Sequence, residues 1–119
     1  MKKSELIIRK SLKYCKNKEI IIQSGATFNW CHKSKKTLPL TVNAFGAVLY
    51  ANNIAKIDGY KDLSKILEED IFWLHRFSMG FDRGYQITLF VKNNHNNEYH
   101  PVHDEISKLG IDLAKEYCK

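Results

Sequence analysis

The chain has 119 residues, of which 44% are hydrophobic and 27% are charged, and its formal net charge is +6. These proportions are typical of a folded domain and exclude a disordered or fibrous chain. The length predicts a single globular domain over residues 1–119, because a chain of this size buries roughly two-thirds of the surface that it exposes when unfolded.

Neither a transmembrane segment nor a signal peptide is expected. No stretch approaches the roughly 20 apolar residues that span a bilayer, and only three apolar residues stand between Glu5 and Arg9. Cys15, Cys31 and Cys118 form no CxxC pair, which fits neither a disulfide framework nor a zinc ribbon. We therefore expect free thiols in a reducing cytoplasm.

Positive charge is concentrated in the first third of the sequence. Residues 1–36 hold ten Lys or Arg against Glu5 and Glu19, so this segment is +8 and the remainder is −2. Such asymmetry indicates an acidic partner: nucleic acid, an acidic protein or an anionic membrane surface. The codon bias of an AT-rich genome is the alternative, because the chain has 16 Lys against 3 Arg, with 12 Ile and 9 Asn.

The first predicted helix begins at Ser4, as its N-cap, and ends near Lys16. One side of it is apolar at the 3.6-residue period and carries Ile7, Ile8, Leu12 and Cys15. Basic residues lie within about 60° of each other on the opposite side: Lys2, Arg9, Lys13 and Lys16. The pattern predicts a core-facing helix with a basic outer face.

A buried strand is predicted over residues 19–24, because this segment is short, rich in β-branched residues and followed by Gly25. Residues 25–37 lack a sustained period and are interpreted as a loop. Pro39 suits a first helical turn, with Thr37 as its cap, and opens a predicted helix to residue 56. This helix should be central and largely buried, with a ridge of small side chains at Ala44, Ala47, Ala51 and Ala55.

A third helix is predicted from its cap, Asp62, to an end at Gly80 or Gly84. Residues 85–92 alternate apolar and polar side chains, which predicts a strand with one buried face. Residues 93–97 form a polar tip. The last helix is predicted to begin at Pro101 and to bury an apolar stripe, Val102, Ile106, Leu109, Leu113 and Tyr117.

The predicted fold is therefore α+β and mostly helical, with four helices and a small two-stranded β element. A two-stranded sheet is marginal alone and must lie on helices or gain a partner strand. Its open edges offer a route to a homodimer.

The stretch EYHPVHDE, residues 98–105, places His100 and His103 beside acidic residues. A metal site would need a third ligand from His75, His95, Asp82 or the neighbouring Cys31 and His32, and none of these has a diagnostic spacing. Helix initiation explains the stretch better, with His100 as the cap, Pro101 in the first turn and acidic residues at the positive helix end. No metal or cofactor is expected, and His100, His103 and Asp82 remain only weak metal candidates.

Residues 28–36 interleave two aromatic residues with basic ones. Single-stranded nucleic acid needs both stacking surfaces and phosphate partners, and this segment offers Phe28, Trp30, Lys33, Lys35 and Lys36. Beside the basic face of the first helix it would form one continuous positive strip. The alternative is that both aromatic side chains turn inward to cover the core.

Other motifs carry little chemistry. In GFDRG, residues 80–84, Asp82 could act as a base and Arg83 could orient an anion, but a helix end explains the two glycines more simply. Cys31 and His32 are neighbours in sequence, and such side chains usually point apart. No phosphate-binding glycine motif occurs in the sequence.

The sequence therefore favours a small cytoplasmic binding module without catalysis, whose basic amino-terminal third engages nucleic acid, or else an acidic protein, without sequence preference. One alternative is a homo-oligomeric structural or interaction protein, indicated by the large apolar residues Phe72, Trp73 and Tyr85. Another is a small metal-dependent hydrolase that uses His100 and His103.

Overall fold

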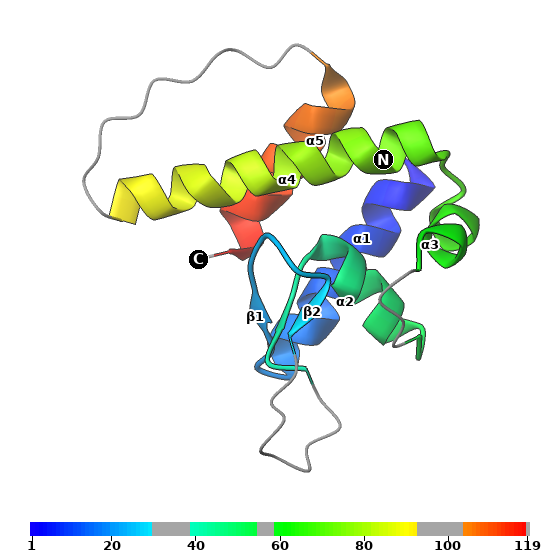
Figure 1. Cartoon of the computed structure of the whole chain (residues 1–119), viewed down its shortest axis with the longest axis horizontal. Helices are drawn as coiled ribbons and strands as arrows, with labels where there is room; N and C mark the ends of the chain where they lie inside the picture. Colours follow the sequence, from blue (N-terminus) through cyan, green and yellow to red (C-terminus); the bar gives the residue numbers. More distant parts are fainter. Residues whose placement is uncertain (30–38, 55–58, 93–103, 119) are drawn as a thin grey trace. The chain divides into compact units, whose positions relative to one another are not determined.

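The structure is a computed structural model that describes residues 1–29, 39–54, 59–92 and 104–118 (Figure 1). The chain divides into two units, Met1–Asp70 and Ile71–Lys119, and each is described by itself. The expectation of one globular domain over the whole chain stays a prediction.

The first unit combines three helices with a small mixed sheet. Its elements, in chain order, are α1 (Lys3–Asn17), β1 (Ile21–Ile22), β2 (Phe28–Asn29), β3 (Thr41–Val42), α2 (Ala44–Ala51) and α3 (Tyr60–Leu67). The strands lie in the order β1-β3-β2, with β3 parallel to β1 and antiparallel to β2. Ile22 and Phe28 both align with Val42, and the side chains of Ile22 and Val42 are buried.

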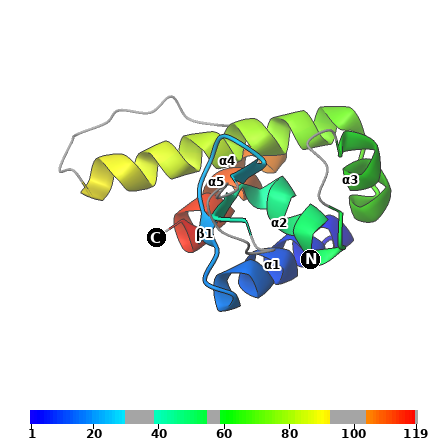
Figure 2. The same cartoon turned by 60° about the horizontal axis from the view of Figure 1, so that its bottom comes forward.

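The core of this unit lies between α1 and α2, which run side by side (Figures 1 and 2). The inner face of α1 contributes Ile8, Leu12 and Cys15, as its period predicts. All residues from Ala44 to Leu49 of α2 are buried, which confirms the expectation of a largely buried helix. Asn43 caps α2, because its side chain accepts a hydrogen bond of 2.7 Å from the backbone N–H of Gly46.

The second unit is a pair of helices, α4 (Ile71–Lys92) and α5 (Glu105–Tyr117). The two helices run in the same direction, since successive turns of α5 meet successive turns of α4. Their backbones approach closely at glycines: Gly80 lies against Ser107, Gly84 against Ile111 and Ala114, and Gly110 against Phe77 and Phe81. The Phe77 ring stacks on Trp73 and Phe81, with centroids 5.4 and 6.1 Å apart, and all three side chains are buried.

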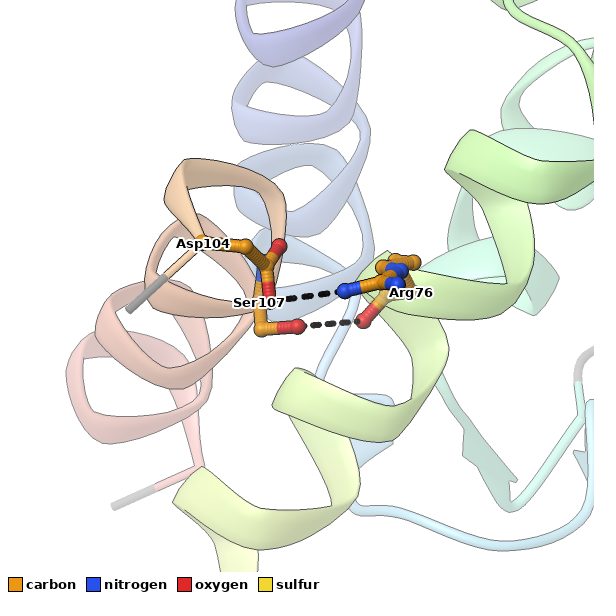
Figure 3. Close-up of polar contacts among 3 residues, drawn as sticks. All are labelled: Arg76, Asp104 and Ser107. Carbon is orange, nitrogen blue, oxygen red and sulfur yellow. Dashed lines mark hydrogen bonds and ion pairs between the residues drawn. The ribbon is translucent and has the colours of Figure 1, made fainter. Parts of the chain in front are cut away.

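Asp104 fixes the start of α5 and ties it to α4 (Figure 3). Its Oδ1 accepts from the backbone N–H of Ser107 at 2.9 Å, and its Oδ2 lies 3.4 Å from Nη1 of Arg76. The hydroxyl of Ser107 donates to the carbonyl of Arg76 at 3.4 Å. Hydrogen bonds from Ser107, together with the smaller effect of the Arg76 charge, lower the pKa of Asp104.

Stability should therefore depend on the charge of Asp104 at acid pH. The pKa of Asp104 is lower in the folded chain than in the unfolded chain. The stabilisation by the ionised carboxylate is therefore complete above the ordinary aspartate pKa of about 3.9, and it is lost as pH falls through the pKa of the folded chain. Asp104→Asn keeps a capping side chain without the charge. In thermal unfolding, we expect the parent to melt higher than the variant at pH 7 and the two to converge near pH 2. A constant difference across this range would contradict the prediction.

The α+β, mostly helical class is confirmed, but several boundaries were wrong. The segment from Pro39 first forms β3, and α2 begins only at Ala44. The single helix predicted from Asp62 is two, α3 and α4, separated at Glu68, which adopts a left-handed conformation with φ 55°. Gly59 is the N-cap of α3, and Asp62 lies in its first turn. The described residues thus form five helices rather than four.

The strand predicted over residues 85–92 is also wrong, because these residues continue α4. Gly80 and Gly84 do not end the helix, since their bare backbones pack against α5. The hydroxyl of Thr88 donates to the carbonyl of Gly84 at 3.1 Å, a bond to the preceding helical turn. Helix α4 therefore continues through a segment whose local propensity favours a strand.

Candidate nucleic-acid interface

Ion pairs neutralise the amino-terminal half of α1. Lys2 lies 3.7 Å from Glu69, Lys3 lies 3.1 Å from Glu68, and Arg9 lies 2.9 Å from Glu5 of its own helix. Three cations thus meet three carboxylates. This end of α1 has little net charge to offer an acidic partner.

Ser4 holds one of these carboxylates, that of Glu69, beside the start of α1. It was expected to cap α1, but Lys2 occupies the N-cap position and Ser4 is buried in the first turn. Its hydroxyl donates to Oε1 of Glu69 at 3.2 Å. The hydroxyl of Ser64 donates to the carbonyl of Glu69 at 2.5 Å, which fixes the same residue from α3. The end of α3 is thereby held against the start of α1.

The carboxyl-terminal half of α1 and its cap remain basic. Four lysines are exposed along it, Lys10, Lys13, Lys16 and Lys18, and Glu19 is the only acidic residue in this segment. Residues 10–19 therefore carry a net charge of +3. Lys10 and Lys13 form no ion pair with any residue in the described ranges. Both ammonium groups are available for a phosphate.

A partly exposed aromatic pair includes one ring from this part of α1. The rings of Tyr14, from α1, and Tyr50, from α2, have centroids 6.0 Å apart and planes inclined at 37°. Tyr14 is 44% exposed and Tyr50 is half-buried. Nζ of Lys18 lies over the Tyr14 ring, 5.2 Å from its centroid. We call Lys10, Lys13, Tyr14, Lys18 and Tyr50 the α1 patch.

Five of the predicted binding residues are described. Lys13 belongs to the α1 patch and Lys16 is exposed in the same half of the helix, whereas Lys2 and Arg9 have carboxylate partners in its other half. Phe28 lies in β2 and is half-buried. The other four, Trp30, Lys33, Lys35 and Lys36, lie outside the described residues. Whether loop and helix form one strip therefore stays a prediction.

Sequence reasoning missed Lys10, Tyr14, Lys18 and Tyr50. The spacing of Lys10, Tyr14 and Lys18 at four residues places them on one side of a helix, so three of the four could have been found. Tyr50 carries no such signal, because it joins the group only through the packing of α2 on α1.

The metal hypothesis gains no support from the described part of the chain. No group of three His, Cys, Asp or Glu that could hold a metal ion occurs there. Asp82 is half-buried within α4, and His75 is exposed on the same helix. The remaining candidates, His100, His103, His95, Cys31 and His32, lie outside the described residues. The described α5 begins at Glu105 with Asp104 as its cap, so a helix start at Pro101 was wrong.

The structure bears on two further expectations, which concern the cysteines and the apolar residues that indicated oligomerisation. Cys15 and Cys118 are buried and neither belongs to a disulfide, as expected, and burial raises the pKa of Cys15 to about 11, which leaves it as the unreactive neutral thiol. Of the apolar residues that indicated oligomerisation, Phe72 is 59% exposed, whereas Trp73 is only 5% exposed and Tyr85 is half-buried. Of these three residues, Phe72 alone presents a largely exposed apolar surface.

No family model, curated protein or solved structure matches this chain. Among the described helices, none combines the length and the apolar character needed to cross a membrane. The function must therefore be inferred from the residues of the α1 patch.

Proposed function

We propose that this chain is a small, non-catalytic nucleic-acid-binding module of the cytoplasm and that the carboxyl-terminal half of α1 contacts the phosphate backbone. The observation that carries the proposal is the division of α1 into a neutralised end and a basic end, where the exposed Lys10 and Lys13 form no ion pair with the described residues. Codon bias alone does not account for an exposed Tyr14 ring with one lysine a turn before it and another a turn after it.

Binding of this kind follows from counterion release. Each ammonium group that replaces a condensed cation on a phosphate makes association more favourable at low salt, without reading the base sequence. Lysine suits such a role, because its compact charge binds phosphate without the planar fork that arginine uses to recognise guanine. We therefore expect sequence-tolerant binding that weakens steeply as salt rises.

The test reverses the charges of the α1 patch. In the variant Lys10→Glu, Lys13→Glu, Lys18→Glu, we expect retention on heparin and on immobilised oligothymidine to be lost at physiological salt. At low salt, where residual binding is measurable, the slope of log K against log salt should become shallower by about 2, since each single-strand phosphate contact contributes about 0.7.

A matched control distinguishes an effect of the α1 patch from an effect of net charge alone. The variant Lys61→Glu, Lys108→Glu, Lys115→Glu also reverses three exposed lysines, but on α3 and α5. Both variants have the same formal charge, so only a site on α1 predicts that the control keeps the parental slope. Equal loss in both variants would show a nonspecific effect of net charge, and binding of anionic vesicles without oligonucleotide would favour a membrane surface instead.

A further inference from the structure

We infer that Tyr14 and Tyr50 form a stacking platform for unpaired bases, so that the α1 patch selects single-stranded over double-stranded nucleic acid. This inference rests on the proposed function, because the lysines must first hold the backbone. It specifies single-stranded nucleic acid as the ligand and assigns the recognition of unpaired bases to residues outside the segment 28–36.

The Tyr14 ring is exposed to solvent. Nζ of Lys18 lies over one face of the ring, 5.2 Å from its centroid, so on that face a base has only a flexible lysine side chain to displace. Tyr14 is also 44% exposed although it belongs to a helix whose inner face is fully buried. A ring exposed beside lysines offers the stacking surface and the phosphate partners that single-strand binding combines.

The position of the ring is also fixed. Tyr14 leans on Tyr50, whose helix α2 is anchored in the core through Val48 and Leu49. A ring held on one side loses less conformational entropy when a base stacks on it than a freely rotating side chain would. The pair therefore acts as a preformed surface rather than as two independent side chains.

The charges around the rings match the polarity of a nucleic-acid strand. Lys10 and Lys18 stand one turn before and one turn after Tyr14 on the same side of the chain, and Lys13 is adjacent. A base that stacks on Tyr14 carries phosphates on both its 5′ and 3′ sides, so lysines on both sides can meet them. Lys18 can leave the ring for a phosphate by side-chain rotation. A duplex keeps its bases stacked inside and can offer the rings none.

The experiment compares Tyr14→Leu with the parent in fluorescence-anisotropy titrations of three labelled ligands. These are a 12-nucleotide oligothymidine, an abasic strand of the same length, and a 12-base-pair duplex. We expect the parent to bind oligothymidine more tightly than the abasic strand. The substitution should weaken oligothymidine binding between about 5-fold and about 150-fold, as for one lost stacked base, and leave the other two ligands unchanged.

Two further variants keep the result interpretable. Tyr14→Phe retains the ring and should bind as the parent does, whereas Tyr60→Leu removes an equally exposed tyrosine of α3, itself paired with Phe45, and should have no effect. If the parent binds oligothymidine and the abasic strand equally and Tyr14→Leu changes nothing, stacking is wrong while the proposed function stands. If the parent binds none of the three ligands, both fail together.

Discussion

Replacing Gly80 by alanine should destabilise the chain by about 3 kcal/mol, although helix propensity alone favours alanine by about 1 kcal/mol. A Cβ at this position would collide with the backbone carbonyl of Ser107, and it would also lie 2.8 Å from the Ser107 Cα. Backbone atoms cannot rotate away as a side chain can, so α4 and α5 must separate. The neighbouring contacts at Gly84 and Gly110 would loosen with them.

Urea unfolding followed by circular dichroism measures this effect, and the sign of the change is the decisive readout. Gln86→Ala makes a helix-favouring substitution at an exposed position of the same helix and should leave stability within about 0.5 kcal/mol of the parent. A more stable Gly80→Ala variant would mean that helix propensity outweighs the packing, and that α4 and α5 do not approach as closely as the glycines indicate.

The glycines of α4 show what local sequence signals can and cannot predict. A glycine near the end of an apolar stripe is a common helix stop, and that interpretation placed the end of the helix at Gly80 or Gly84. The deciding contact comes from Ser107 and Ile111, on a helix much later in the chain. A single sequence does not show which backbone will lie beside a glycine, and ending the helix at these glycines left residues 85–92 to be interpreted as a strand although they continue α4.

Helix α1 was predictable because its evidence is local. Its apolar positions repeat over 15 residues, and the side that they define is the side that is buried. The basic outer face was equally readable from the sequence. Its division into a neutral and a basic end was not, because the carboxylate of Glu69 comes from 65 residues away and reaches Ser4 only in the folded chain.

Replacing Gly46 by alanine should lower the free energy of unfolding by about 3 kcal/mol or more, because it disturbs a hydrogen bond as well as packing. A Cβ there would collide with the carbonyl of Thr27 and would lie 3.2 Å from the Cβ of Val42. The Thr27 carbonyl accepts a hydrogen bond of 3.3 Å from the backbone N–H of Asn43, the N-cap of α2. Moving this carbonyl would therefore break the bond between the β2 region and the start of α2 as well as the packing.

Gly25→Ala is the matched control, because Gly25 has φ 105° and a Cβ added there would meet no described heavy atom within 4 Å. This substitution should lower the free energy of unfolding only by the conformational cost of a positive φ at alanine, about 1–2 kcal/mol. Urea unfolding should therefore rank the parent above Gly25→Ala and Gly25→Ala above Gly46→Ala. Equal losses would mean that α2 can shift away from the sheet at little cost. Since α2 carries Tyr50, such freedom would also count against a preformed stacking surface.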